Sequence, residues 1–542
     1  MNLTLLDYIS IVLFVSAVLG VSMYKSRQKK SSAGYFLAER GATWWLIGFS
    51  LIAANISTEQ FVGMSGAGAG NAGLAIASYE WIAAITLVFV AIFFLPRFLS
   101  AGIYTIPEYL EYRYNAAART VMSLFLMVIY VCVTIVAVVY SGGLTIHAIF
   151  DWPLVPSIWL IGILAAAYTT FGGLKAVIWA DLIQGSALIL GGAIVLFFGL
   201  QAMTPDGGLL AGWGAFMDQA GEKMHMSLPN EHPELPFTAL LFGIWIPNFY
   251  YWGLNQYITQ RTLASKSLSE GQKGVLFAAF LKLLIPFVIV IPGIMALILF
   301  PADLGGASET AKDAAYPVLV RKLVPQGLSG FMLAALAGAV MSSLASMLNS
   351  ASTIFTMDLF KRYIRRDAGD NQLVLVGRIT TIIFVVIGCL IAPKLADPRF
   401  GGVFKYIQDF QGFISPGILT AFVFGLIVKR TPAAAAIAAM IANVPIYGIL
   451  HFSAVQTAIV KIAPFMGAMT DAGVGSIAFL NQMAITATCL IIVMAVVTFV
   501  KPLKEPVVMP VNADFDMRTS KAIPLTGAFI IALTILLYII FW

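Results

Sequence analysis

Charged residues are scarce in this chain of 542 residues. Asp, Glu, Lys and Arg make up 11% of it, against about 25% in soluble domains, whereas 60% of the chain is hydrophobic and its mean hydropathy is +0.91. This composition excludes a soluble globular fold. It predicts an all-α polytopic membrane protein.

Cysteine and histidine are also rare. Cys132, Cys389 and Cys489 each lie inside an apolar run, which argues against a disulfide framework. The four histidines show no H-x-x-x-H or similar spacing, so no metal cluster is indicated. The apolar runs also hold no combination of histidine, cysteine and aspartate. A membrane-embedded enzyme is therefore disfavoured.

Apolar runs of about 18 residues or more mark membrane helices, and the sequence predicts fourteen of them. The first is followed, not preceded, by its basic residues, which is not the pattern of a cleaved signal peptide. The predicted spans are 5–24, 44–72, 75–96, 119–149, 154–171, 176–201, 236–259, 272–300, 327–360, 372–392, 402–428, 432–451, 474–500 and 522–541.

The net charge of +6 comes mainly from predicted cytoplasmic loops, where Lys and Arg collect, and does not indicate nucleic-acid binding. The even number of spans places both termini outside, with Trp542 in an interfacial aromatic belt. The outer loop 202–235 is acidic, and the outer loop 301–326 fits the charge pattern least well. The cations predicted inside are Arg97, Arg113, Arg119, Lys175, Arg261, Lys266, Lys273, Lys361, Arg362, Arg365, Arg366, Lys429, Arg430, Lys501, Lys504, Arg518 and Lys521.

Two predicted spans are interrupted by polar residues. The second contains Asn55, Ser57, Thr58, Glu59 and Gln60 within six residues, and the seventh is polar over 248–257. Unsatisfied polar groups cost several kcal/mol in hydrocarbon, so such segments must face protein or water. Two interrupted spans that are five apart and cross in opposite directions predict an inverted repeat with discontinuous helices and a binding site at the midplane.

Ionisable residues inside predicted spans are few: Glu59, Glu80, Asp181, Lys282 and, at a span start, Asp409. A charge at the bilayer centre costs at least ~2.5 to 3.5 kcal/mol, so each one suggests a functional site. The pattern favours function for Glu80 and Lys282. It leaves Asp181 open between function and a structural ion pair, and it favours an interfacial or supporting role for Asp409.

A stripe of small and hydroxyl residues follows one face of the ninth span, formed by Ala339, Ser342, Ser343, Ser346 and Ser350. Close helix packing explains such a stripe without any ligand. Adjacent hydroxyls that face a broken helix with free carbonyls would also supply the hard oxygen ligands that an alkali cation prefers. Both interpretations stay open on the residues alone.

Five stretches carry a resemblance to known proteins, in order along the chain: 50–57, 77–81, 250–253, 278–283 and 342–350. Together they resemble the sodium/solute symporter family, and within it the bacterial sodium/galactose symporters and, less closely, the animal sodium/glucose cotransporters. The resemblance covers nearly the whole chain. Any one stretch would be weak evidence, whereas all five in order are strong.

The resemblance implies a five-plus-five inverted-repeat core, with one extra helix before it and three after. The expected division is 1–42 for the extra helix and cytoplasmic linker, 43–201 and 236–430 for the two repeats, 202–235 for the outer loop, and 431–542 for the last three helices.

The resemblance also implies which residues act. Sodium would be held by carbonyls of Ala53, Ile56 and Ala339 and by the hydroxyls of Ser342 and Ser343, with Asp181 on its path to the cytoplasm. A sugar would be bound by Asn55, Gln60, Glu80, Asn248, Lys282 and Gln408. Met64, Tyr79 and Phe404 would form the outer gate and Tyr251 the inner gate.

These expectations describe a secondary transporter of a bacterial inner membrane that couples sodium entry to hexose uptake by alternating access. Amide, carboxylate and ammonium groups supply the donors and acceptors that sugar hydroxyls need. Ala83 departs from the sodium/galactose symporters, which have a sugar-contacting serine there, so the preferred epimer stays open. Alternatives are sodium symport of an inositol, an organic acid or an amino acid, and an uncoupled channel. Glu80 argues against an anionic solute.

The topology is testable by thiol labelling in intact cells. Cysteines replacing Gly207 and Ser267, in a chain whose three native cysteines are replaced, should react with a membrane-impermeant reagent from opposite sides, because an odd number of predicted spans separates them. Labelling of both positions from outside would contradict the fourteen-span topology.

Overall fold

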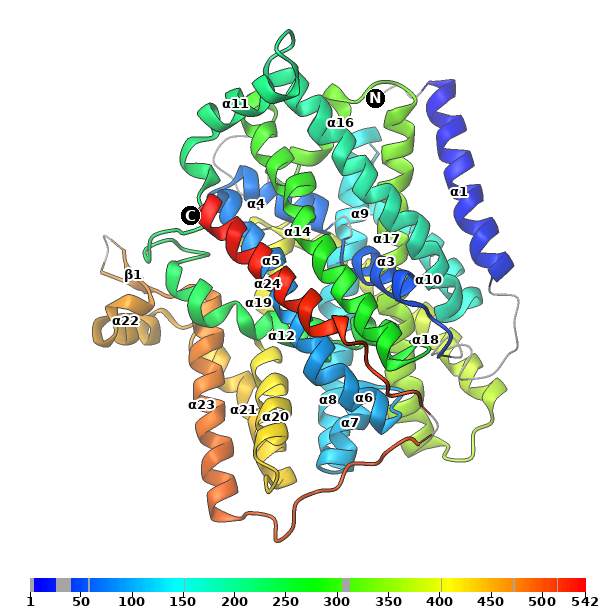
Figure 1. Ribbon diagram of the computed structural model, residues 1–542, viewed down its shortest axis with the longest axis vertical. Helices are drawn as coiled ribbons and strands as arrows, with labels where there is room; N and C mark the ends of the chain where they lie inside the picture. Colours follow the sequence, from blue (N-terminus) through cyan, green and yellow to red (C-terminus); the bar gives the residue numbers. More distant parts are fainter. Residues whose placement is uncertain are drawn as a thin grey trace.

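The computed structural model describes residues 4–25, 40–56, 59–150, 152–304, 312–400, 402–470, 473–513 and 515–542. Almost all of it is helical, which confirms the predicted all-α class (Figure 1). In the described residues the only strands are β1 (Ala468–Met469) and β2 (Gly475–Ser476), which form an antiparallel hairpin.

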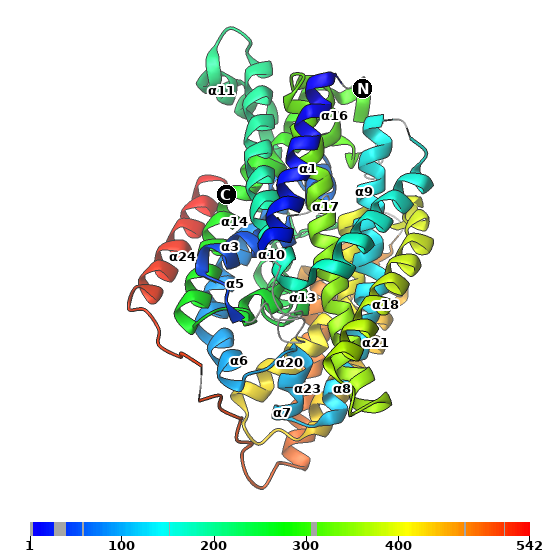
Figure 2. The ribbon, with the colours of Figure 1, turned by 90° about the vertical axis from the view of Figure 1, so that its right-hand side faces the viewer.

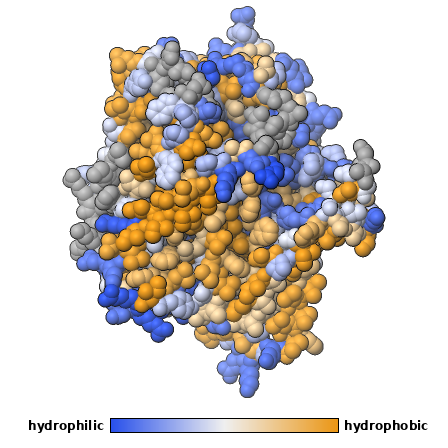
Figure 3. Space-filling model, turned by 180° about the vertical axis from the view of Figure 1, so that it is seen from behind, coloured by the Kyte–Doolittle hydropathy of each residue, from blue (hydrophilic) through white to orange (hydrophobic). Residues whose placement is uncertain are grey.

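Among the residues that the structure describes, eight helical segments are long and apolar enough to cross a membrane, or ten if each of two bent helix pairs forms one span. The number fourteen stays a prediction. Apolar residues cover much of the back of the molecule, and hydrophilic residues lie at its upper and lower ends and in a patch near the middle of this face (Figure 3). The eight segments are Gly73–Ala101, Ala116–His147, Val177–Met203, Leu268–Leu299, Leu328–Ile364, Asp370–Ala396, Phe479–Val500 and Ala522–Ile540.

The first part of the chain runs from α1 and an interrupted second helix through α10 to the end of segment 202–235, which is predicted to lie outside. Its elements up to that segment are α1 (Leu5–Lys25), α3 (Trp44–Asn55), η2 (Glu59–Met64), α4 (Ser65–Ala69), η3 (Gly73–Ala77), α5 (Ser78–Phe89), η4 (Val90–Phe94), α6 (Leu95–Ala101), α7 (Ile106–Arg113), α8 (Ala116–Ile129), η5 (Tyr130–Thr134), α9 (Ile135–Phe150), α10 (Leu154–Met203), α11 (Gly208–Ala220) and η6 (Gly221–Met224).

The second part begins with η7 and another interrupted helix. Its elements are η7 (Ala239–Gly243), α12 (Trp245–Leu254), α13 (Gln256–Leu263), α14 (Leu268–Leu299), η8 (Pro301–Leu304), α16 (Ala315–Leu323), α17 (Leu328–Thr353), η9 (Ile354–Ile364), α18 (Asp370–Ile391), η10 (Ala392–Ala396), η11 (Pro398–Phe400), α19 (Val403–Gly412), α20 (Ser415–Ile427), α21 (Ala433–Ile449), α22 (Ser453–Ile462), η12 (Pro464–Met466), α23 (Phe479–Val500) and α24 (Ala522–Ile540).

Both predicted interruptions are breaks in the backbone. Helix α3 ends at Asn55, Ile56 is extended, and the chain resumes as the π-helical turn η2. Helix α12 ends at Leu254, and Asn255 is extended before α13 begins. Each break leaves carbonyls at a helix end without their intrahelical partners. Ser57 and Thr58 lie outside the described residues, and the side chain of Glu59 is not described either.

Other predicted spans differ in detail from the structure. Residues 402–428 form two helices, α19 and α20, with a bend of 48° between them, and α21 meets α22 at 91°. The predicted fifth and sixth spans belong to one assigned helix, α10. The predicted outer loop 202–235 is partly helical, because it contains α11 and η6.

Helix α10 nevertheless folds back between its two apolar halves. Ile161 and Val340 both lie within 3.4 Å of the point that a Cβ at Gly142 would occupy, and Ser342 donates a hydrogen bond to Asp181. Residue 161 thus lies near Val340 of α17, and residue 181 lies beside Ser342, two residues further along the same helix. In a straight helix residues 161 and 181 would be about 30 Å apart.

Two arginines predicted in cytoplasmic loops are buried instead. Arg113, at the end of α7, is 5% exposed and donates to the carbonyls of Gly425 at 2.9 Å and Val428 at 3.0 Å, among others that follow α20. Arg261 lies within α13 and is 1% exposed. Counting cations by loop failed here because the broken helices carry basic residues into the protein, where carbonyls and carboxylates satisfy them.

The C-terminus packs against segment 202–235, the predicted outer loop. The amide of Met226 donates to the carbonyl of Phe541 at 2.8 Å, and the ring of Trp542 meets that of Phe237 at 5.9 Å. Helix α24 thus packs beside α5 and α14 instead of standing apart (Figure 1).

Helix α1, which precedes the predicted repeats, lies along α17 (Figure 2). The buried carboxylate of Asp7 accepts hydrogen bonds from the amides of Gly327 and Gly330, both at 2.8 Å, and from the Ser329 hydroxyl at 2.7 Å. Thr4 also donates to it. A carboxylate at a helix N-terminus satisfies unpaired amides and opposes the positive end of the helix dipole.

We therefore expect Asp7→Asn to destabilise the protein. The change removes the charge from hydrogen bonds that are worth about 1.5–3 kcal/mol each to a charged group. The thermal unfolding midpoint in detergent should fall, whereas Asp516→Asn, which affects an exposed pair with Arg518, should leave it unchanged. An unaltered unfolding midpoint in Asp7→Asn would show that Asp7 does not stabilise the packing of α1 on α17.

Candidate functional site

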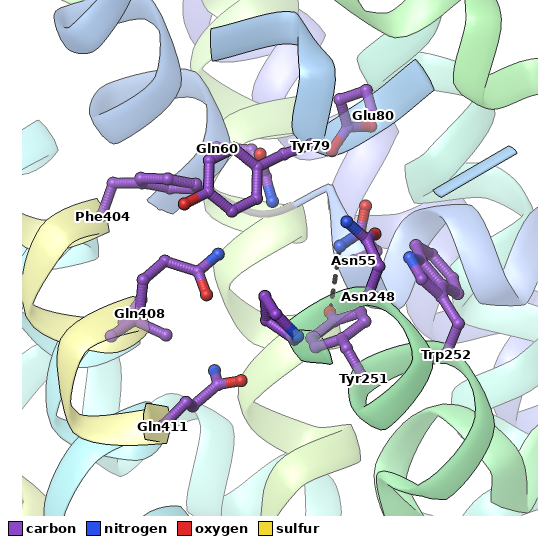
Figure 4. A pocket seen from close by; sticks show the side chains of 12 residues that line it. Asn55, Gln60, Tyr79, Glu80, Asn248, Tyr251, Trp252, Phe404, Gln408 and Gln411 are labelled. Atoms are coloured by element: carbon purple, nitrogen blue, oxygen red, sulfur yellow. Dashed lines mark hydrogen bonds between the residues drawn. The ribbon is translucent and has the colours of Figure 1, made fainter. Parts of the chain in front are cut away.

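A cavity lies where the break after α3 faces α5, α12 and α19 (Figure 4). It contains most of the residues predicted to bind a sugar, which come from segments far apart in the sequence. The amide groups of Gln408 and Gln411 point into the space opposite Asn248 and Tyr251. The lining residues are Asn55, Gln60, Tyr79, Glu80, Pro247, Asn248, Tyr251, Trp252, Phe404, Ile407, Gln408 and Gln411.

Helical spacing explains how α19 contributes to the cavity. Phe404, Ile407, Gln408 and Gln411 recur at intervals of three and four residues, so they share one face of the helix. The same spacing brings Pro247, Asn248, Tyr251 and Trp252 together on α12. The predicted site residues do not include Pro247, Trp252, Ile407 or Gln411, although Ile407 and Gln411 follow Phe404 at +3 and +7.

Lys282 and Glu80 form a buried ion pair beside this cavity. The Lys282 ammonium donates to Glu80 Oε2 and to Asn55 Oδ1, and it lies 4.9 Å from the centre of the Trp252 ring. Lys282 is fully buried and Glu80 is 3% exposed. The pair joins α5 to α14 and fixes the side chain at the end of α3. A charge in such surroundings needs a partner of opposite sign.

The predicted inner gate is hydrogen-bonded across the break. Asn55 Nδ2 donates to the Tyr251 hydroxyl at 3.0 Å, and the Tyr257 hydroxyl donates to the same oxygen at 2.5 Å. Tyr251 therefore connects the end of α3 to both sides of the break at Asn255. This arrangement places a ring against the cavity and holds it by two hydrogen bonds.

Two of the three predicted outer-gate residues are in contact. The rings of Tyr79 and Phe404 meet edge to face, with centroids 4.9 Å apart. Met64 is buried in η2 but is not among the cavity-lining residues. Ala83, one turn after Glu80, is also buried and does not line the cavity. Direct contact of Met64 or Ala83 with a solute stays a prediction.

Two polar groups of the cavity are available to a ligand. Gln60 Oε1 and the Tyr79 hydroxyl are buried and have no hydrogen-bond partner among the described residues. Buried polar groups are normally satisfied, so an exception at a cavity is a place where a polar solute or water would bind. Asn248 differs, because its amide nitrogen donates to the carbonyl of Ile244 at 3.0 Å.

The residues predicted to bind sodium meet where α17 crosses the end of α3. Ser343 Oγ donates to the carbonyl of Ala54 at 3.2 Å, and Ser342 Oγ donates to Asp181 Oδ1. Ala53 and Ile56 are buried at the end of α3, and Ala339 is buried on α17 one turn before Ser343. Carbonyl and hydroxyl oxygens are hard ligands that suit an alkali cation. Their ligation of sodium stays a prediction.

The two remaining ionisable residues differ in position. Asp181 is fully buried on α10 and bonds Ser50 Oγ at 2.5 Å as well as Ser342, so it lies next to the predicted sodium site. Asp409 lies outside the cavity lining, accepts a hydrogen bond from Tyr447 at 3.0 Å and meets His451 at 3.2 Å. No group of three or more His, Cys, Asp or Glu able to hold a metal occurs in the described part of the chain.

A buried polar cavity beside two helix breaks defines the protein as a transporter of the inverted-repeat type. Residues 35–443 match the model of the sodium:solute symporter family. This chain therefore belongs to the sodium:solute symporter family, as its sequence motifs suggested. It is a multi-pass membrane transporter that couples solute movement to sodium, and it is not an enzyme.

Several named proteins are similar to it. A sodium/glucose cotransporter of Vibrio parahaemolyticus is 45% identical over 83% of this chain and 86% of its own length. An uncharacterized symporter of Escherichia coli is 36% identical over 96% and 88%. The human sodium/myo-inositol cotransporter 2 is 34% identical over 78% and 66%.

One solved structure supports the fold. A sodium-coupled sialic acid symporter, in a substrate-bound outward-open state, superposes with a TM-score of 0.75. The match covers 94% of this chain and all of the other, at 21% identity. This likeness concerns the backbone fold alone.

The Glu80–Lys282 pair makes a testable energetic prediction. Lys282→Met should lower the unfolding midpoint strongly, because loss of one partner of a buried pair costs about 3–5 kcal/mol. In the double variant Glu80→Gln/Lys282→Met the free energy of unfolding should fall by much less than the sum of the decreases in the two single variants. Thermal unfolding in detergent would measure all three.

Lys322→Met is the matched control. Lys322 pairs with Asp303 at 2.5 Å, but both side chains are more than a third exposed. Removal of this pair should therefore lower the free energy of unfolding by only about 0–1 kcal/mol. Additive losses in the double variant would show that Glu80 and Lys282 are energetically independent.

Proposed function

We propose that this protein carries a hexose, galactose or glucose, into the cell together with sodium by alternating access. The observation that carries this proposal is the cavity itself, in which amides, a tyrosine hydroxyl and a neutralised carboxylate surround a space beside the helix breaks. The 45% identity to a protein named sodium/glucose cotransporter supports the same solute class.

The donors and acceptors of the cavity suit a neutral polyol. Asn55, Gln60, Asn248 and Gln408 offer amide groups, and Glu80 keeps oxygen lone pairs after it has accepted one bond from Lys282. Because the two charges compensate each other, an added carboxylate on the solute would remain unpaired. This argues against an organic acid. A site whose buried polar groups match the solute hydroxyls also rejects analogues that lack one.

Sodium would be held by the carbonyls of Ala53, Ile56 and Ala339 and by the hydroxyls of Ser342 and Ser343. The crossing of α17 and α3 that forms this site adjoins the cavity through Asn55. An ion there would stabilise the junction between the two predicted repeats. When the sodium ion leaves past Asp181, the end of α3 would lose the contacts that the ion made with it. The solute binds against this end of α3.

The gates would open in turn. Tyr79 and Phe404 close the cavity on one side by ring contact, with Met64 behind them in η2, and Tyr251 closes it on the other through Asn55. We infer that the side with Tyr79 faces out of the cell and the side with Tyr251 faces in, with both termini outside in a bacterial inner membrane.

A second candidate solute is myo-inositol, another neutral ring of hydroxyls. Relatives named sodium/myo-inositol cotransporter 2 are 34–35% identical to this chain. Ala83 favours neither solute, because it does not line the cavity.

Counterflow in proteoliposomes tests the function. With an inward sodium gradient, labelled galactose or glucose should accumulate, and unlabelled sugars should compete in an order that identifies the epimer. Myo-inositol and sialic acid belong in the same panel. Uptake that persists without sodium would indicate a channel, and failure of every hexose to compete would contradict the substrate class.

Ser343→Ala tests the ion site in the same assay. The change removes one of five proposed ligand oxygens, so the half-saturating sodium concentration should rise at least about tenfold, the scale of one hydrogen bond or ligand contact. Ser352→Ala is the control, because Ser352 lies on the same helix and donates only to Asn349 O within it, at 2.9 Å. Equal sodium dependence in both variants would make the serine stripe a packing surface.

A further inference from the structure

Arg261 is the most fully bonded buried cation near the proposed ion site. Its guanidinium donates to Asp181 Oδ2 at 2.9 Å, to Ser50 Oγ at 2.7 Å and to the Ser50 carbonyl at 3.0 Å. It also donates to the hydroxyl of Ser346, which in turn donates to the carbonyl of Ser342 at 2.7 Å. One side chain of α13 therefore contacts α3, α10 and α17.

The partners of Arg261 are those that a leaving sodium ion would meet. Asp181 accepts from Arg261 on one oxygen and from the proposed ligand Ser342 on the other. A second cation at Asp181 would be repelled by the guanidinium held on Oδ2, because two like charges in a buried site destabilise each other. Sodium and Arg261 would therefore compete for one carboxylate.

The same short helix also holds the inner gate. Tyr257 lies four residues before Arg261 on α13, and its backbone carbonyl accepts a hydrogen bond from the Arg261 guanidinium. Its hydroxyl donates to Tyr251, which accepts a second bond from Asn55. A displacement of Arg261 would act on the gate within one helical turn.

We propose that α13 couples sodium release to the opening of the inner gate, with Arg261 as a built-in cation that competes with sodium for Asp181 and Tyr257 as the residue that positions Tyr251. Sodium that moves from the α3–α17 crossing to Asp181 displaces the guanidinium. The shift of α13 then withdraws Tyr257 from Tyr251, and the solute path opens. The proposal rests on the sodium site proposed above.

A purely structural ion pair makes a different prediction for sodium affinity. If Arg261 only supported the fold, its loss would disturb the site and weaken sodium binding, or would tighten it through the removed charge alone, with or without the Asp181 carboxylate. If Arg261 competes with sodium for Asp181, its loss must tighten sodium binding and slow sodium release only while that carboxylate is present. The dependence of the change on Asp181 therefore distinguishes the two roles.

The test measures sodium binding to the purified protein without any solute, by its intrinsic tryptophan fluorescence. Arg261→Gln should lower the half-saturating sodium concentration about tenfold, the smallest effect expected for one charge-assisted hydrogen bond. It should also slow solute counterflow. Arg261→Lys, which keeps the competing charge, should stay within about threefold of the wild type. Tyr257→Phe should leave sodium binding unchanged but make solute release less dependent on sodium.

Two controls keep the result interpretable. In an Asp181→Asn background Arg261→Gln should have no further effect on sodium affinity, because the contested carboxylate is gone. Arg113→Gln removes another buried arginine, one that bonds carbonyls after α20, and should lower stability without changing sodium affinity.

Weaker or unchanged sodium binding in folded Arg261→Gln, or an equal effect in the Asp181→Asn background, would overturn the proposal. Absence of sodium binding in the wild type would instead contradict the proposed sodium site. Because sodium binding is measured without solute, a wrong assignment of the hexose would leave this test intact.

Discussion

Every polar group inside the bilayer must find its partner within the protein, and the architecture of this chain depends on that constraint. An unsatisfied group costs several kcal/mol in hydrocarbon. The breaks at Ile56 and Asn255 nevertheless release backbone groups in the middle of apolar helices. They are tolerated because hydroxyl and amide side chains of neighbouring helices surround them. The solute cavity and the proposed ion site lie where this need for polar partners is greatest.

Buried charged residues also find their partners within the protein, and two of these ion pairs connect the two predicted repeats. Glu80 pairs with Lys282, and Asp181 pairs with Arg261, so each pair takes one residue from 43–201 and one from 236–430. Buried ion pairs contribute little net stability compared with apolar packing. Such pairs between the predicted repeats suit a protein whose halves must rearrange, because they contribute little net stability that opening would have to overcome.

Much of this arrangement could be predicted from the sequence, and the failures have physical causes. Polar residues in apolar runs revealed both breaks, because hydrocarbon makes such residues costly, and their charges marked Glu80 and Lys282 as candidate site residues. Their direct contact with each other was not predicted. Arg261 was predicted in a loop because cations were counted by position in the chain, whereas burial depends on what α3, α10 and α17 present to it. The roles of individual residues in binding sodium or a solute remain predictions.

Residues without a local anomaly could not be found in this way. Trp252 and Ile407 are ordinary apolar residues of helices, and only the packing of α12 against α19 makes them part of the cavity. Asp7 stands near the start of an apolar run and resembles an interfacial residue. Its partners, Gly327 and Gly330, are more than 300 residues away in the chain, so no local pattern connects them.

Charge compensation in the cavity also has a consequence for energy coupling. Because Glu80 and Lys282 neutralise each other, a neutral solute adds no charge to the moving site, and in the proposed cycle sodium alone responds to the membrane potential. One charge moved through 100 mV gains about 2.3 kcal/mol. That energy corresponds to a roughly fiftyfold concentration ratio of solute before the sodium gradient itself is counted. An anionic solute would cancel the charge of the ion and lose this contribution, so the neutral cavity and the cation-dependent gate are suited to the same class of solute.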